Sequence, residues 1–276
     1  VFILQFFLIH AMWDKILAFS LENDRMKIDK IIMQKIDYNL TAVVTPDATY
    51  NVSGNGYEPR GQIRKGGYVI DTSNEKPFLQ AAQLSTILSD ASLEYNPTTK
   101  RTEVVGDLFE GALLAFASRA GINSGEFQKK HPVLDSGSFP LLGVKRARII
   151  KNGRLNIALF IGDGPVLLDQ AKWIFSEAGV TSITDEIRKK LKDQSHALAS
   201  RDTMVLGFAT RNSSKNVLTD RIFGDLIFNG FFVLIQTVTE IEVAEVEPQS
   251  EMGAVKEMGW FQKILEILGR RFGRRE

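Results

Sequence analysis

The chain has 276 residues, 44% of them hydrophobic and 24% charged, with a formal net charge of +1. This composition is typical of a globular protein with a well-buried core, and the near-neutral charge predicts no nucleic-acid partner. No cysteine is present, which excludes disulfides and cysteine-ligated zinc, and His10, His131 and His196 lie at no metal-ligand spacing, so we predict no metal site.

The first predicted segment, residues 1–32, begins with a strongly apolar run. In Val1–Phe19 this run is interrupted by His10, Asp14 and Lys15, which leaves it too short for a membrane-spanning helix of about 20 residues. We interpret it as an amphipathic helix that seeks a hydrophobic surface, in the chain's own core, on a partner or on a membrane.

The body of the chain, residues 33–246, alternates strand-like and helix-like patterns. Apolar periodicity and turn residues predict strands at 42–45, 49–52, 102–105, 144–150, 155–161, 204–209 and 225–235, and helices at 78–93, 108–120, 165–175 and 187–200. Asn152-Gly153 predicts a tight hairpin turn. Because strands come mostly as adjacent pairs with helices between them, we predict an α+β fold with a largely antiparallel twisted sheet flanked by helices.

The third predicted segment, residues 247–276, is an acidic linker followed by a basic amphipathic helix. In Trp260–Arg275, apolar residues gather on one side and five lysine or arginine residues on the other. Such a helix suits an anionic membrane surface or an acidic groove, and docking of a terminal helix on its own domain is an equal alternative.

The most informative stretch runs from Val104 to Gly121, where a β-rich run breaks at Gly106-Asp107 and passes into a helix beginning near Leu108. It contains the sequence GDLFEGAL at Gly106–Leu113. Asp107 and Glu110 fall on the first helical turn, where carboxylates interact favourably with the helix dipole. Any helix start can use such a pair, so the spacing alone leaves a purely structural role open. The residue sequence itself is more specific than this spacing, because it resembles the G-D-P-T-E-G-A-L signature of the nucleotide-binding domain of cation-transporting P-type ATPases.

Other blocks resemble the same family in the same order. Tyr50–Gly61 is similar to its Y-x-V-x-G-x-G-Y-x-P-x-G hairpin, and Ser89-Asp90-Ala91 resembles the end of its A-x-L-C-N-D-A helix. Gly162–Leu168 occupies the place of K-G-A-P-E-V-L-L, and Arg201–Arg211 is similar to R-D-T-L-R-x-L-A-x-A-x-R. The resemblance covers about residues 33–246.

The resemblance implies an ATP site made by a stacking aromatic ring, a lysine, a carboxylate and an arginine. Carried over, Glu110 would accept a hydrogen bond from the adenine amino group, and Arg201 would contact the phosphates. Asp107, at the start of the same helix, is a further predicted site residue. The stacking phenylalanine corresponds to Leu134. The lysine corresponds to Ile161, beside Gly162 in the same predicted site. Losing both contacts would weaken binding by about a hundredfold or more.

The family's phosphorylation motif D-K-T-G-T-L-T is also missing. The equivalent place, 21–28, reads LENDRMKI, with Asp24 near the acceptor position but no Thr-Gly-Thr. We therefore predict a free-standing, degenerate nucleotide-binding domain, with ATP binding weak or lost, no catalytic residue, no phosphorylation or transport by itself, and a regulatory role. It would be cytoplasmic or peripheral at the membrane.

Two alternatives stay open. The first is a non-catalytic scaffold that docks on a membrane surface or a membrane pump through its amphipathic ends, Val1–Phe19 and Trp260–Arg275. The second is an active fragment of a pump whose remaining domains lie on another chain, which the missing phosphorylation motif disfavours.

Overall fold

The computed structural model describes residues 20–22, 25–27, 31–219 and 222–244. The predicted amphipathic segments at 1–19 and 260–275 and the linker from 247 lie outside these residues, so their roles remain predictions from sequence. Within the described part of the chain, every helix is too short or too polar to cross a membrane.

The chain divides into two compact units, one of residues 36–239 and one of residues 1–35 with 240–276. In the second unit, β1 (Ser20–Glu22) pairs antiparallel with β2 (Arg25–Lys27). The unit of residues 36–239 holds the helices and nearly all of the sheet that the following paragraphs describe.

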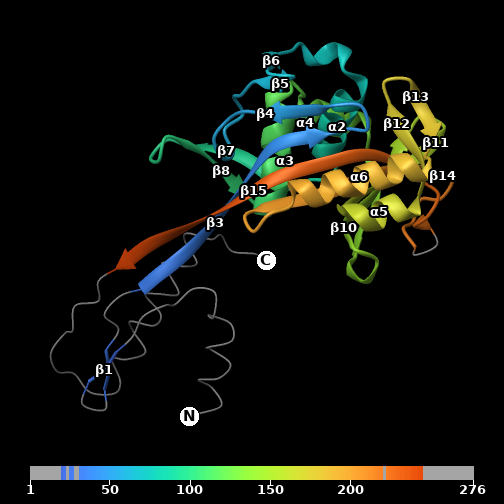
Figure 1. Cartoon of the computed structure of the whole chain (residues 1–276). Coiled ribbons are helices and arrows are strands. Elements are labelled where there is room, and N and C mark those ends of the chain that lie inside the picture. The colour runs from blue at the N-terminus through green and yellow to red at the C-terminus, as the bar shows by residue number, and fades with distance from the viewer. Residues whose placement is uncertain (1–19, 23–24, 28–30, 220–221, 245–276) are drawn as a thin grey trace. The chain divides into compact units, whose positions relative to one another are not determined.

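The central sheet of the first unit is long and largely antiparallel (Figure 1). Its main path runs in the order β6 (Tyr68–Val69), β5 (Ile63–Lys65), β4 (Thr49–Val52), β3 (Ile31–Val44), β15 (Leu226–Ala244), β14 (Thr203–Ser213), β11 (Leu155–Asp163), β10 (Val144–Asn152) and β9 (Val133–Phe139). A side branch adds β12 (Ala171–Ser176), which pairs parallel with β15, and β13 (Gly179–Ser182). A separate hairpin joins β7 (Ser92–Asn96) and β8 (Arg101–Val105).

Helices cover both faces of this sheet (Figure 1). One hydrophobic cluster packs α2 (Lys76–Ile87), α3 (Leu108–Arg119) and α4 (Ser124–Lys130) on the sheet, and the other packs α5 (Gly164–Gln170) and α6 (Asp185–Leu198). Alternate residues of β11 separate the two layers. Leu159 and Ile161 belong to the first cluster, whereas Ala158 and Phe160 belong to the second. The predicted α+β fold with a flanked antiparallel sheet is thereby confirmed.

Two predicted helices are wrong in their second halves. The helix predicted over 78–93 ends at Ile87, because the chain turns there and 92–96 pairs with β8. The helix predicted over 165–175 ends at Gln170, because the following residues, which include Trp173 and Phe175, pair with β15 and β13 instead. The predicted turn at Asn152-Gly153 is confirmed, with Gly153 at φ 62°.

The glycine-rich motif at 50–61 folds around the side chain of Arg119, the last residue of α3. Arg119 is buried, and its guanidinium donates hydrogen bonds to Glu58 O (2.9 Å), Asn39 Oδ1 (2.9 Å) and Gly56 O (2.6 Å). Gly54 has φ +130°, and a Cβ there would lie 2.6 Å from Arg119 Nε. The conformation and the close approach therefore both require glycine at this position.

A second polar contact secures the start of α2. Tyr50 is fully buried and donates a hydrogen bond to Glu75 Oε2 at 2.6 Å, while Lys65 Nζ lies 2.7 Å from the same oxygen. Hydrogen bonds from Lys65 and then Tyr50 lower the pKa of Glu75. Burial, followed by the contact with Glu75, raises the pKa of Tyr50.

We expect Glu75→Gln to lower the free energy of unfolding at pH 7 by about 1 kcal/mol, because it removes charge-assisted hydrogen bonds from a partly exposed site. The folded-state pKa of Glu75 is depressed, so its contribution is full above the unfolded-state pKa and is lost as pH falls through the folded-state value. Urea unfolding of both proteins at pH 7 and pH 3 should therefore show a smaller difference at pH 3. An equal difference at both pH values would contradict this assignment. Lys65→Met removes the hydrogen bond that lowers the pKa of Glu75 most, so the free energy of unfolding should change less between pH 7 and pH 3 in this variant.

Candidate functional site

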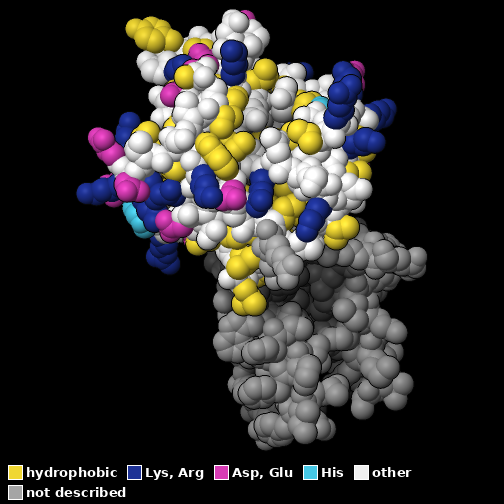
Figure 2. All heavy atoms as spheres, turned by 90° about the vertical axis from the view of Figure 1, so that its right-hand side faces the viewer, with side chains coloured by type: hydrophobic (Ala, Val, Ile, Leu, Met, Phe, Trp, Pro, Cys, Tyr) yellow, Lys and Arg dark blue, Asp and Glu magenta, His cyan; other side chains and the backbone are white. Residues whose placement is uncertain are grey.

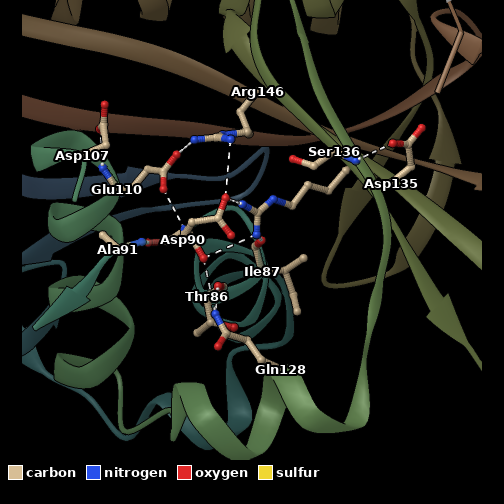
Figure 3. A network of polar contacts seen from close by, with 12 residues as sticks. Thr86, Ile87, Asp90, Ala91, Asp107, Glu110, Gln128, Asp135, Ser136 and Arg146 are labelled. Atoms are coloured by element: carbon tan, nitrogen blue, oxygen red, sulfur yellow. Dashed lines mark hydrogen bonds and ion pairs between the residues drawn. The ribbon is translucent and has the colours of Figure 1, made fainter. Parts of the chain in front are cut away.

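The two most family-like helix motifs meet in space (Figure 3). Gly106 takes φ +114° and lets the chain turn from β8 into α3, where Asp107 Oδ1 accepts from Glu110 N at 3.0 Å as the helix cap. Glu110 is only 3% exposed, and its Oε2 accepts from Asp90 N at 2.6 Å. The carboxylate of one motif therefore fixes the backbone of the other.

Two arginines of β10 complete an acid–arginine cluster with Asp90 and Glu110. Arg146 pairs with Glu110 Oε1, and its Nη1 lies 3.6 Å from Asp90 Oδ2. Arg148 is buried, pairs with the same Asp90 oxygen and donates to the carbonyls of Ile87 and Ser89. Both carboxylate oxygens of Glu110 thus have protein partners, and the cluster joins the end of α2, the start of α3 and the sheet.

An open cleft of about 430 Å³ is lined by residues of β9, β10, β11 and β14 and of the turn between β9 and β10. Its lining residues are Ser138, Pro140, Gly143, Val144, Lys145, Gly162, Asp163, Val205 and Leu206. The sheet register brings them together, because Val144 pairs with Gly162 and Asp163 pairs with Leu206. The walls are mainly apolar, with one ammonium and one carboxylate among them.

Lys145 lines the cleft at a position where β10 carries a bulge. Two successive pairs of β10 and β11, Val144 with Gly162 and Arg146 with Ile161, leave Lys145 as the extra residue. A bulge re-aims the side chain that it inserts, and bulges are common beside binding sites.

The bulge directs two consecutive cations to the first turn of α3. Lys145 Nζ lies 4.7 Å from the centre of the Phe109 ring, and Arg146 pairs with the next residue, Glu110. Arg146 is neutralised by the acid–arginine cluster. Lys145 is exposed and lies over an aromatic ring, and among the described residues it forms no ion pair, so it can meet an anionic ligand.

The structure separates the other predicted site residues. Gly162 lines the cleft, and a Cβ there would lie 2.1 Å from Gly143 O. Leu134 is exposed on β9, Ile161 is fully buried in the α2–α3 core, and Arg201 is exposed in the turn before β14; none of these lines the cleft. Phe139, the aromatic residue at the end of β9, packs partly buried against the α5–α6 core. The nucleotide roles assigned to these residues from the resemblance remain predictions.

The sequence alone indicates no role for Lys145, Arg146 or Asp163. The adjacent basic pair after Gly143 was the available signal, but its meaning depends on the bulge. No cluster of three or more histidine, aspartate or glutamate side chains that could hold a metal ion occurs among the residues that the structure describes.

Comparison with known proteins finds one family model, described as P-type ATPase, cytoplasmic domain N, which matches residues 78–238. The calcium-transporting ATPase of Bacillus subtilis is 22% identical over 173 residues, which is 62% of this chain and 19% of that protein. The cation-transporting ATPase pma1 of Synechocystis is 36% identical over 103 residues, 36% of this chain and 11% of that protein. Calcium-transporting ATPase 1 of Lactococcus lactis is 27% identical over 144 residues, 50% of this chain and 16% of that protein. The matched region therefore spans a fifth or less of each relative.

Proposed function

The chain belongs to the family of P-type ATPase cytoplasmic N domains, and we propose that it binds an adenine nucleotide weakly in the cleft, with Lys145 facing the phosphates. One observation carries the proposal: an open, mainly apolar cleft of about 430 Å³ has the exposed Lys145, at a β-bulge, among its lining residues. We further propose that the chain neither forms a phosphoenzyme nor transports ions by itself, and that its role is regulatory.

Weak binding follows from the composition of the cleft. No aromatic side chain is among its lining residues in the described structure, so a base would stack only on aliphatic walls such as Val205 and Leu206. Lys145 is the one cation among the described residues that line it. Basic and acidic side chains are interspersed over the described part of the face drawn in Figure 2, and the formal net charge of the chain is only +1, so a broad positive field is not expected to add to this cation. We expect a Kd near the millimolar range, equivalent to about −4 kcal/mol.

We expect Lys145→Ala to weaken ATP binding about tenfold, because it removes the one cation of the cleft. Isothermal titration with millimolar ATP, supported by ligand-observed NMR, measures the change. Lys151→Ala is the matched control, since Lys151 is exposed on the same strand but does not line the cleft. Undetectable ATP binding by the unmodified chain, or equal affinity in Lys145→Ala, would refute the proposal.

The alternative function, docking on a membrane or a pump through the amphipathic ends, stays a proposal from sequence. Both ends lie outside the described residues, so the geometry of the cleft neither favours nor opposes it. The relatives are calcium- and cation-transporting ATPases, and each is far longer than the region that this chain matches.

A further inference from the structure

Asp163 is the carboxylate that lines the cleft in the described structure. Its Oδ1 caps α5 by accepting from Val166 N at 3.0 Å. Its backbone N–H donates to Gly143 O at 2.8 Å, and the residue pairs across the sheet with Leu206. These contacts hold the backbone and one carboxylate oxygen in place. Among the described residues, Oδ2 has no hydrogen-bond partner, and the side chain is exposed at the cleft lining, so this oxygen is free to accept from a ligand.

Glu110, the carboxylate that the family resemblance points to, is not equally available. It is 3% exposed, and its two oxygens already accept from Asp90 N and pair with Arg146. Because the carboxylate is buried between these partners, a ligand could reach it only if one of them moved away, which would leave a buried charge or N–H group without its partner. Asp163 needs no such rearrangement.

An ionised carboxylate only accepts hydrogen bonds, so it selects ligand edges that carry donors. Adenine presents an exocyclic amino group, which supplies such donors, while the phosphates of a nucleotide need the cation Lys145 rather than the acid. We propose that Asp163 Oδ2 accepts a hydrogen bond from the adenine amino group and makes the cleft prefer adenine over a purine that lacks this group. This inference rests on the proposed function.

The test compares ATP with purine riboside 5′-triphosphate, which lacks only the amino group. We expect the unmodified chain to bind ATP about tenfold more tightly than the analogue. In Asp163→Ser, where serine can still cap α5 but does not extend further into the cleft, the two ligands should bind within about twofold of each other. Asp71→Ser is the matched control, because Asp71 caps a short helix outside the cleft, and it should keep the full preference.

The outcomes separate the two proposals. Equal binding of ATP and the analogue by the unmodified chain, with both weakened in Lys145→Ala, would overturn the role of Asp163 and leave the cleft as the nucleotide site. A preference that persists in Asp163→Ser would also overturn it. Absence of binding by either ligand would overturn both proposals.

Discussion

Replacing Arg119 by leucine should lower the free energy of unfolding by about 3 kcal/mol. The guanidinium is buried and donates to Glu58 O, Asn39 Oδ1 and Gly56 O, so its removal leaves these acceptors without donors beneath the loop. Burial lowers the pKa of Arg119, and its hydrogen bonds offset the cost of keeping the charge there. Urea unfolding followed by circular dichroism at pH 7 measures the change.

Two variants sharpen this test. Arg154→Leu makes the same exchange in the exposed β10–β11 turn and should change stability by less than about 0.5 kcal/mol. Arg119→Lys keeps the charge but cannot reproduce the planar fork of donors. Its stability should therefore lie between that of the unmodified chain and that of Arg119→Leu. If Arg119→Leu unfolds at the same urea concentration as the unmodified chain, the loop is not held by this side chain.

The sequence predicted the elements whose causes are local. The helix at 108–120 follows from a cap and an apolar stripe, and the turn at Asn152-Gly153 from residues that accept positive φ. The strand at 171–176 has no such local signature. Its apolar run also fits a helix, and pairing with β15, far along the chain, decides between them.

The same distinction holds for the candidate site. The motif around Glu110 could be found because its residues are contiguous in the sequence. The partners of Glu110, which are Asp90 and Arg146, come from other elements. Lys145 could not be placed at all, because a regular strand would alternate the sides of consecutive residues and only the register with β11 reveals the bulge. Asp163 was hidden for a similar reason, since the cleft that it lines exists only once four strands have assembled.

Glu110→Ala should lower the free energy of unfolding by about 3 kcal/mol, because it breaks a buried ion pair from one side and leaves Asp90 N without an acceptor. Glu126→Ala is a close control. Glu126 occupies the same position relative to its helix cap in α4, where Glu126 N bonds to Asn123 Oδ1, but it is exposed. Its loss should change stability by less than about 0.5 kcal/mol. A double-mutant cycle with Arg146→Ala should give a coupling energy above about 1 kcal/mol.

ATP affinity in the same variant separates the structural role of Glu110 from the adenine contact that the family resemblance predicts. Measured at low temperature, where Glu110→Ala is still folded, the Kd should stay within about twofold of the unmodified value if the carboxylate only holds Asp90 and Arg146. A tenfold loss in the folded variant would restore Glu110 as the adenine ligand and mean that the nucleotide displaces a cluster partner. Glu110→Gln is the decisive companion, because it keeps an acceptor for Asp90 N while losing the charge that Arg146 needs. If it matches Glu110→Ala in stability and the unmodified chain in affinity, the ion pair is structural and the ligand contacts lie elsewhere in the cleft.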